Sequence, residues 1–267
     1  MTVAMGSALG RWVARKLAEP RHVHSPVAPA SLQDLQACLQ PGDVVLVEGN
    51  SRVSTAVKYL TQSTWSHAAL YVGPLVDQPL VDGQVRCIVE ADMVEGVRAV
   101  PLKQFAGLHT RVCRPASLSV SDAMRVCRHA TERLGHLYDL RNIVDLVRYL
   151  LPTPPVPQQW RRRMLSLGSG DPTRAICSTL IAEAFESVRY PVLPHIESRP
   201  ANDPLCPACV DEILHVRHHS LFVPRDFDVS PYFEVVKPTL VAGFDHRRLR
   251  WHEGHLPLPV MASVTAH

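Results

Sequence analysis

Apolar and polar positions recur along the chain with the periods of short strands and amphipathic helices. Turn residues at Pro41-Gly42-Asp43 and Gly73-Pro74 bound the first two apolar runs. Period-two or continuous apolar runs predict strands over 44–47, 66–72, 85–90 and 111–113. Helical spacing predicts helices over 51–61, 121–134, 140–151 and 177–188. Short strands mixed with helices in this order favour an α+β domain.

Proline and glycine clusters divide the chain into a core and three irregular segments. Residues 1–30 end in a Pro-rich stretch and are expected to form a flexible leader. Residues 31–245 are expected to form one compact domain, and 246–267 a loose tail. Residues 152–170 are too rich in proline and glycine for regular structure, so we expect an insert that forms a flap over a cleft. A disordered loop without a role is the alternative.

Composition excludes several classes of partner. Hydrophobic residues make up 46% of the chain, charged residues 20%, and the formal net charge is only +3, which gives no basic field for nucleic acid. No apolar run reaches the roughly 18 residues of a membrane-spanning helix. Basic residues Arg11, Arg15 and Lys16 follow the first apolar stretch, the reverse of a secretory signal, so we expect a cytoplasmic protein. Those residues and Arg161–Arg163 leave peripheral membrane contact open.

The cysteines do not form the pattern of a disulfide framework. There are seven of them, an odd number spread over a long chain. Free cysteine packs as a small apolar residue, and this is the interpretation for the four that lie in apolar periodic segments: Cys38, Cys87, Cys113 and Cys127. Only Cys177 and the pair Cys206 and Cys209 remain as candidates for chemistry.

The pair in Cys206-Pro207-Ala208-Cys209 raises a zinc hypothesis. His215, His218 and His219 follow it, and both residue types are zinc ligands. The spacing matches no defined zinc site and there is no second cysteine pair, so free surface thiols in a loop are the favoured interpretation. We therefore predict no metal and no cofactor, and keep Cys206 and Cys209 as a weak zinc alternative.

Cys177 lies in the first turn of a predicted helix. Apolar residues from Ile176 to Val188 recur with the helical period, and Asp171-Pro172-Thr173 precedes them as a start signal. Unpaired N–H groups and the positive end of the helix dipole there lower a thiol pKa, which favours the nucleophilic thiolate. The same first turn, at Cys177 and Ser178, is a candidate site for an oxyanion. A buried core cysteine is the alternative.

His67 and Glu90 supply the partners that such a thiol needs. Alternation places His67, Ala69 and Tyr71 on one face of a strand, and the small Ala69 leaves room beside the imidazole. Glu90 ends the next apolar run, where a buried carboxylate needs a partner. A carboxylate bonded to the far ring nitrogen would orient the imidazole and fix its tautomer.

At these positions the sequence resembles the YiiX/YaeF group of permuted papain-like amidases. That group is related to NlpC-type cell-wall hydrolases and to lecithin:retinol acyltransferase. The likeness spans roughly residues 40 to 190, and the segments that carry it are Gly42–Val47, Trp65–Gly73, Val89–Ala91 and Ile176–Phe185.

The resemblance implies a fold and a set of roles. The fold would be a circularly permuted papain-like (NlpC-type) one, an antiparallel sheet packed on the catalytic-cysteine helix. Carried over by motif, Cys177 is the nucleophile, His67 the base and Glu90 the orienting residue. The segment Gly135–Asp139 resembles one whose tyrosine lies near the site, so Tyr138 would hold the oxyanion or the thiol. A core tyrosine is about as well supported.

We therefore expect a thiol hydrolase or amidase that transfers an acyl group from an amide or ester to Cys177 and then to water. Its substrate would be a small-molecule, peptide or lipid amide or ester. A lipid acyltransferase or phospholipase of the same superfamily is one alternative. The others are a catalytically silent binding module and a zinc-stabilised interaction domain.

Overall fold

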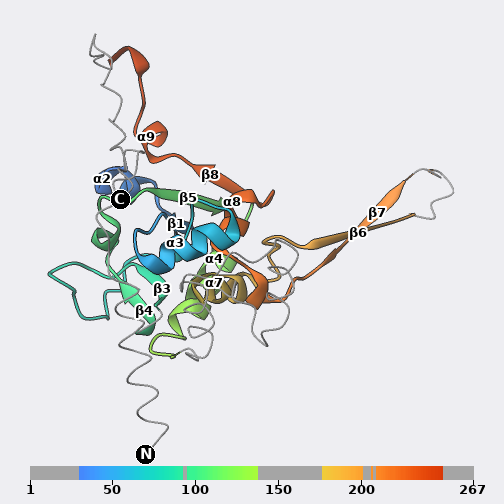
Figure 1. Cartoon of the computed structure of the whole chain (residues 1–267), viewed down its shortest axis with the longest axis horizontal. Coiled ribbons are helices and arrows are strands. Elements are labelled where there is room, and N and C mark those ends of the chain that lie inside the picture. Colours follow the sequence, from blue (N-terminus) through green and yellow to red (C-terminus); the bar gives the residue numbers. More distant parts are fainter. Residues whose placement is uncertain (1–29, 93–94, 138–175, 201–205, 207–208, 249–267) are drawn as a thin grey trace, which may run out of the picture.

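The computed structural model describes residues 30–92, 95–137, 176–200, 206 and 209–248 (Figure 1). Its main strands are β1 (Val44–Val47), β2 (His67–Tyr71), β3 (Ile88–Asp92), β4 (Gly96–Val100), β5 (Thr110–Pro115), β6 (His195–Pro200), β7 (Val210–His215) and β8 (Phe233–Val236). Its helices are α2 (Leu32–Cys38), α3 (Arg52–Thr61), α4 (Val120–Thr131), α7 (Ile176–Glu186), α8 (Pro224–Val229) and α9 (Pro238–Val241), with short 3₁₀ turns η1 (Leu102–Phe105), η2 (His219–Leu221) and η3 (His246–Arg248).

The strands form an antiparallel sheet in the order β4-β3-β2-β1-β5-β8. In the centre of the sheet, Val47 of β1 lies opposite His67 of β2 on one side and Thr110 of β5 on the other. At one edge Glu90 of β3 lies opposite Arg98 of β4. The register therefore brings residues that are distant in sequence to one end of the sheet.

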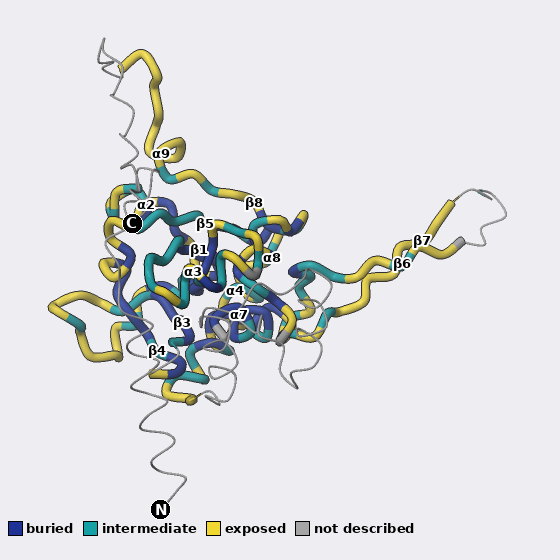
Figure 2. Tube along the Cα trace, viewed as in Figure 1, coloured by how far each residue is buried: buried dark blue, intermediate teal, exposed yellow. Residues whose placement is uncertain are grey.

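Both faces of the sheet are covered, which explains the continuous apolar runs of its central strands. All four residues of β1 are buried, and they alternate between two apolar clusters (Figure 2). Val44 and Leu46 pack with α7 and α4, whereas Val45 and Val47 pack with α2 and η1. The molecule thus has a helix layer, a sheet and a second, thinner helix layer.

Helix α7 is the largest apolar element on the first face. Leu180, Ile181, Ala184 and Phe185 are fully buried, so the helical stripe predicted from the sequence is the surface that packs on the sheet. Cys177 is the second residue of the helix and lies in its first turn, as predicted. The α+β class predicted from the sequence is confirmed.

The segment after Tyr190 is more regular than the sequence indicated. Its sequence has few periodic stretches, but β6 and β7 pair as a hairpin that projects from the body of the molecule (Figure 1). Helix α8 packs under the sheet, and β8 extends the sheet beside β5. Strand pairing decided these elements, and single-sequence periodicity does not report it.

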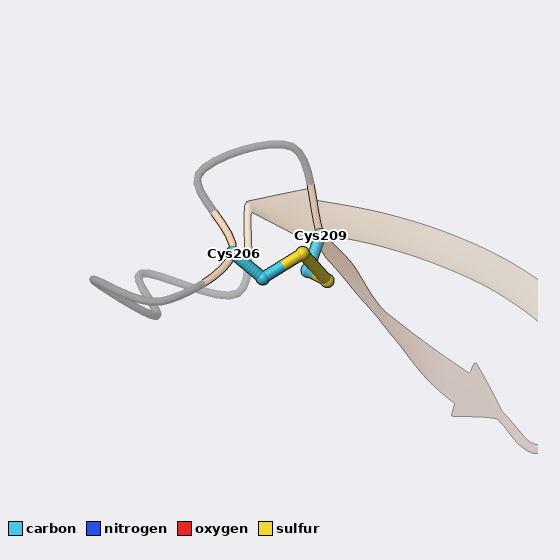
Figure 3. The surroundings of a disulfide bond; sticks show 2 residues. All are labelled: Cys206 and Cys209. Carbon is cyan, nitrogen blue, oxygen red and sulfur yellow. A yellow bond between two sulfur atoms is a disulfide. The ribbon is translucent and has the colours of Figure 1, made fainter.

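The prediction of free thiols at Cys206 and Cys209 is wrong, because the two form a disulfide near the end of that hairpin (Figure 3). Their Cα atoms are 5.3 Å apart, within the range that a disulfide spans. With both sulfurs in this bond, the pair does not supply thiolate ligands to zinc. Among the described residues no group of three or more His, Cys, Asp or Glu side chains is arranged to hold a metal.

Several predicted segments lie outside the described residues: the leader through residue 29, the helix 140–151, the insert 152–170, Tyr138 and the tail from residue 249. The first residues of the predicted tail form η3. None of the described helices is long and apolar enough to cross a membrane.

Candidate active site

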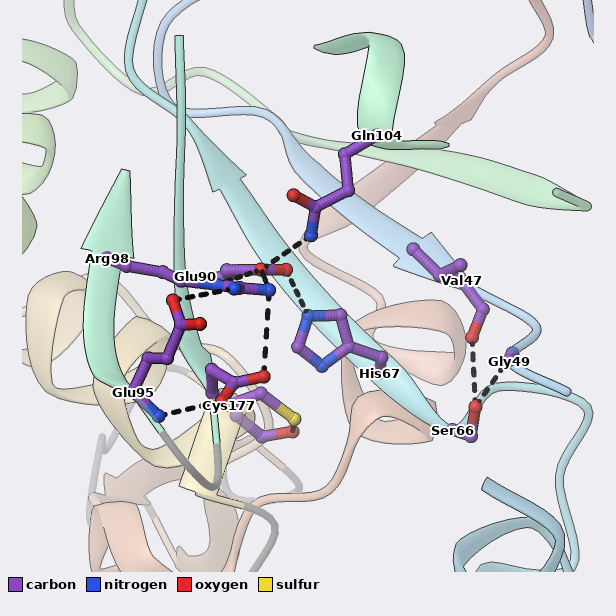
Figure 4. A network of polar contacts seen from close by, with 11 residues as sticks. Val47, Gly49, Ser66, His67, Glu90, Glu95, Arg98, Gln104 and Cys177 are labelled. Carbon is purple, nitrogen blue, oxygen red and sulfur yellow. Dashed lines mark hydrogen bonds and ion pairs between the residues drawn. The ribbon is translucent and has the colours of Figure 1, made fainter. Parts of the chain in front are cut away.

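The backbone that leads into β2 is anchored immediately before His67 (Figure 4). Ser66 is buried, and its backbone N–H donates to the Val47 carbonyl at 3.1 Å. The Ser66 hydroxyl oxygen accepts a hydrogen bond from the Gly49 N–H at 2.9 Å. A Cβ on Gly49 would lie 2.3 Å from Oγ of Ser54 and 2.9 Å from Oγ of Ser66, so a larger residue here would force both serine side chains to move. The start of β2, and with it His67, is thereby fixed.

His67 is held by Glu90 from the neighbouring strand. Nε2 of His67 lies 2.7 Å from Oε2 of Glu90. The Glu90 side chain is only 4% exposed and that of His67 is 27% exposed, so solvent screens the contact weakly. This bond fixes the orientation of the ring and leaves Nδ1 directed to the other side.

The second oxygen of Glu90 has its own donors (Figure 4). Oε1 accepts from Nε of Arg98 at 2.9 Å and lies 2.7 Å from Nη2 of the same side chain. Nε2 of Gln104, from η1, donates to the same oxygen at 2.9 Å. Burial alone raises the pKa of Glu90, but the bonds and charges of His67 and Arg98 outweigh it and lower the pKa to about 2. Glu90 is therefore ionised at neutral pH.

The Cys177 thiol faces the free side of the imidazole (Figure 4). Burial raises the pKa of this thiol, whereas its interactions with His67 and with the Ala68 backbone lower it. Sγ also lies 3.9 Å from the hydroxyl oxygen of Ser178, a residue that is fully buried. Strand β2 pairs with β3 only at Leu70 and Tyr71. Ala68 is therefore not paired with a residue of β3.

The thiol and the imidazole shift each other's pKa in opposite directions. Burial alone raises the pKa of Cys177, but the positive charge of His67 and the hydrogen bonds to Sγ lower it overall. Burial alone lowers the pKa of His67, but the thiolate of Cys177 and the carboxylate of Glu90 raise it well above its ordinary value. Both shifts favour the thiolate and imidazolium ion pair over the neutral pair.

No other free cysteine in the described part of the chain has this environment. Burial raises the pKa of Cys113 to about 12 and that of Cys127 to about 11. Burial also raises the pKa of Cys38 and of the half-buried Cys87. Only at Cys177 is a cation placed to overcome the cost of burying the thiolate.

The structure thus brings together Cys177, His67 and Glu90, the three residues that the sequence singled out, and sets Ser178 beside the sulfur. Glu90 lies in the middle of β3, whereas the sequence placed it at the end of a strand. Their catalytic roles remain a prediction, as does the role of Tyr138.

Sequence reasoning missed Arg98 and Gln104, which hold the far side of Glu90. Arg98 could have been found from the sequence, because it is the one charged residue of the strand β4. It lies between Val97 and Ala99, which are buried, so alternation directs it to the other face of the sheet. Gln104 lies in a short 3₁₀ turn, where no periodicity marks a residue as buried or paired.

Comparison with known proteins agrees with this picture. The family model described as "Permuted papain-like amidase enzyme, YaeF/YiiX, C92 family" matches residues 38–149, a range that includes His67 and Glu90. A solved structure with a detectable likeness is the metalloprotein yiiX from Escherichia coli O157:H7, at 18% identity and a TM-score of 0.42, over 74% of this chain and 96% of that chain. No curated protein matches the sequence.

The resemblance inferred from the sequence motifs and the permuted papain-like fold class are therefore confirmed. The family match also supports the coarser part of the functional prediction, a cysteine hydrolase of the amidase type.

Proposed function

Starting from the resemblance to the permuted papain-like amidases, we propose that the protein hydrolyses an amide or ester bond through an acyl-enzyme on Cys177. His67 is the acid and base of the reaction, and Glu90 orients it. The observation that carries the proposal is the contact chain from Cys177 through His67 to Glu90, in which the thiol alone among the described free cysteines has a lowered pKa.

The first half of the reaction forms a thioester. The Cys177 thiolate attacks the carbonyl carbon, and the electrons of the C=O bond move to the oxygen. When the tetrahedral intermediate collapses, the bond to the amine or alcohol breaks and the His67 imidazolium gives the leaving group its proton. The product of this half is an acyl group on Sγ and a neutral imidazole.

The second half returns the enzyme to its starting state. Neutral His67 takes a proton from a water molecule, whose oxygen attacks the thioester carbonyl. Collapse of the second intermediate releases a carboxylic acid and the Cys177 thiolate, next to an imidazolium once more. Glu90, ionised throughout, stabilises the positive charge on His67 without taking its proton.

The oxyanion of both intermediates has donors nearby. Cys177 is in the first turn of α7, where backbone N–H groups have no partner in the helix and the dipole is positive. Its own N–H is the first candidate donor to the oxyanion, because the carbonyl under attack must lie beside Sγ.

Thiol labelling tests the assignment of the nucleophile. With limiting iodoacetamide at neutral pH, Cys177 is expected to be alkylated before the other four free cysteines, because only its pKa is lowered. Peptide mass spectrometry measures the order. Half-buried Cys87 is the internal control, since it is more accessible but has a raised pKa. Labelling of Cys87 ahead of Cys177 would contradict the assignment.

The pH dependence of kcat/KM is expected to be bell-shaped. The active pair is thiolate with imidazolium, so the rate rises as Cys177 loses its proton, below the ordinary thiol range because its pKa is lowered. The rate falls as His67 loses its proton, above the ordinary imidazole range because its pKa is raised. Stopped-assay kinetics across pH measure both limbs. A value of kcat/KM that is still rising with pH in the ordinary range of thiol pKa values would contradict the ion pair.

A further inference from the structure

A pocket of about 320 Å³ opens between the end of α3, the start of β5 and helix α8. Polar side chains dominate its wall. They come from Gln62–Trp65, from His109 and Arg111, and from Arg225 and Asp228. The reaction proposed above leaves this pocket without a role.

One cation of the pocket is held in a fixed orientation. The guanidinium carbon of Arg111 lies 5.0 Å from the centre of the Trp65 ring, and its Nη1 is 2.5 Å from Oδ1 of Asp228. Nε1 of Trp65 donates to the other oxygen, Oδ2, at 2.9 Å. Asp228 is thus neutralised by Arg111, and the planar guanidinium keeps further N–H donors beside the pocket.

A second cation supplies the surplus charge. Arg225 is exposed at the start of α8, donates to the Thr61 carbonyl at 3.4 Å, and makes no ion pair with any described carboxylate. The neighbouring Asp226 accepts from the Val223 N–H at 3.0 Å and lies 3.7 Å from Arg217. The charge of Arg225 therefore makes the pocket positive.

The sheet places this pocket at the same end as the predicted base. Val47 lies between His67 and Thr110, so the start of β5 is two strand spacings, about 10 Å, from His67. Arg111 shares a face of β5 with Cys113, which packs in the same cluster as α7. Trp65, two positions before His67, belongs to that cluster as well. The pocket residues Trp65 and Arg111 thus lie on the face of the sheet that α7 covers.

We propose that this pocket binds an anionic group of the substrate, a carboxylate or a phosphate, while Cys177 attacks a carbonyl at the same end of the sheet. This rests on the proposed function. It names the substrate class: an amide or ester that carries a negative charge several bonds from the scissile bond. Arg111 and Arg225 supply the charge, and the hydroxyls of Ser63 and Thr64 supply neutral donors.

The anion pocket is tested with pairs of activated esters that differ only in whether they carry a negative charge. The substrates are p-nitrophenyl half-esters of straight-chain dicarboxylic acids of increasing length, each compared with its methyl-capped neutral twin. For the wild type we compare kcat/KM of each charged half-ester with that of its neutral methyl-capped counterpart. The charged compound is expected to be favoured by at most about tenfold. This maximum is expected at the chain length that reaches from Cys177 to the pocket. Arg225→Gln is expected to bring the ratio of the two kcat/KM values close to one.

The matched control is Arg128→Gln, which removes an exposed arginine from α4, a helix that contacts the opposite end of β2. It is expected to leave the ratio unchanged. A second series with a terminal phosphonate identifies the source of the anion: preference for the phosphonate favours a phosphate-bearing substrate, and preference for the carboxylate a peptide-like one. A ratio near one at every length in both series, or a ratio that Arg225→Gln leaves unchanged, overturns the proposal.

Failure of the proposed function gives a different result. If no ester is turned over in a way that depends on Cys177, the hydrolase assignment fails, and the pocket is judged by binding alone. Inorganic phosphate, followed by phosphorus NMR line broadening, is expected to bind saturably to the wild type and about tenfold more weakly to Arg225→Gln. Absence of saturable binding to the wild type overturns the anion pocket as well.

Discussion

Cys177→Ala is expected to lower kcat for amide or ester hydrolysis by about 10⁶-fold, close to the loss seen when a triad nucleophile is removed. The reason is that, among the free cysteines the structure describes, only Cys177 has a lowered pKa and interacts with His67. Steady-state turnover of the best substrate found by screening peptide, N-acyl and phospholipid compounds measures the effect. Circular dichroism confirms that the fold is retained.

Cys87→Ala is the matched control for this substitution. Cys87 is also a free thiol, but its pKa is raised, so its loss is expected to leave turnover unchanged. If Cys177→Ala keeps turnover within about tenfold of the wild type, the covalent mechanism is wrong. Hydrolysis would then proceed through a group other than Cys177.

Glu90→Gln is expected to lower kcat by up to about 10⁴-fold while the protein stays folded. The amide has nearly the shape of the carboxylate but no charge, so it stabilises the imidazolium less and permits the wrong ring orientation. The pKa of His67 should fall accordingly, because Glu90 contributes to its elevation. Turnover as a function of pH measures both changes, since the alkaline limb moves to lower pH.

Glu95→Gln separates this effect from a general loss of negative charge. Glu95 pairs with the same Arg98, at 2.9 Å, but is 63% exposed and lies away from the imidazole. Its substitution is expected to change kcat by less than about twofold. Equal losses in the two variants would mean that Glu90 acts through Arg98 and not through His67.

The central strands, helix α7 and the position of Cys177 could be predicted from the sequence, because each depends on the local pattern of apolar and polar residues. Strand β1 is wholly apolar, β2 follows a turn, and α7 carries a helical apolar stripe. Cys177 could be placed in a first helical turn for the same reason. That His67 and Cys177 would meet came from the family resemblance, since periodicity carries no information about contacts between distant elements.

Features that depend on pairing could not be predicted in this way. Arg98 is recognisable as a partner only once β4 is aligned so that it lies opposite Glu90. The β6–β7 hairpin is exposed along β7, so the buried pattern that marks a strand is absent there. The disulfide of Cys206 and Cys209 was missed because the odd count and wide spacing of the cysteines argued against any bridge.

The order of the elements has a consequence during synthesis of the chain. The ribosome releases β1 to β5 first, so His67, Glu90 and Arg98 emerge long before Cys177. An unfinished polypeptide can pair these strands and bring the carboxylate and imidazole together, yet it lacks Cys177, the nucleophile of the proposed reaction. The sheet face formed by Val44, Leu46 and Leu70 also stays uncovered until α7 arrives. Covering that face and placing Cys177 beside His67 are one event, so under the proposed function a nascent chain gains its hydrolytic site only when its core closes.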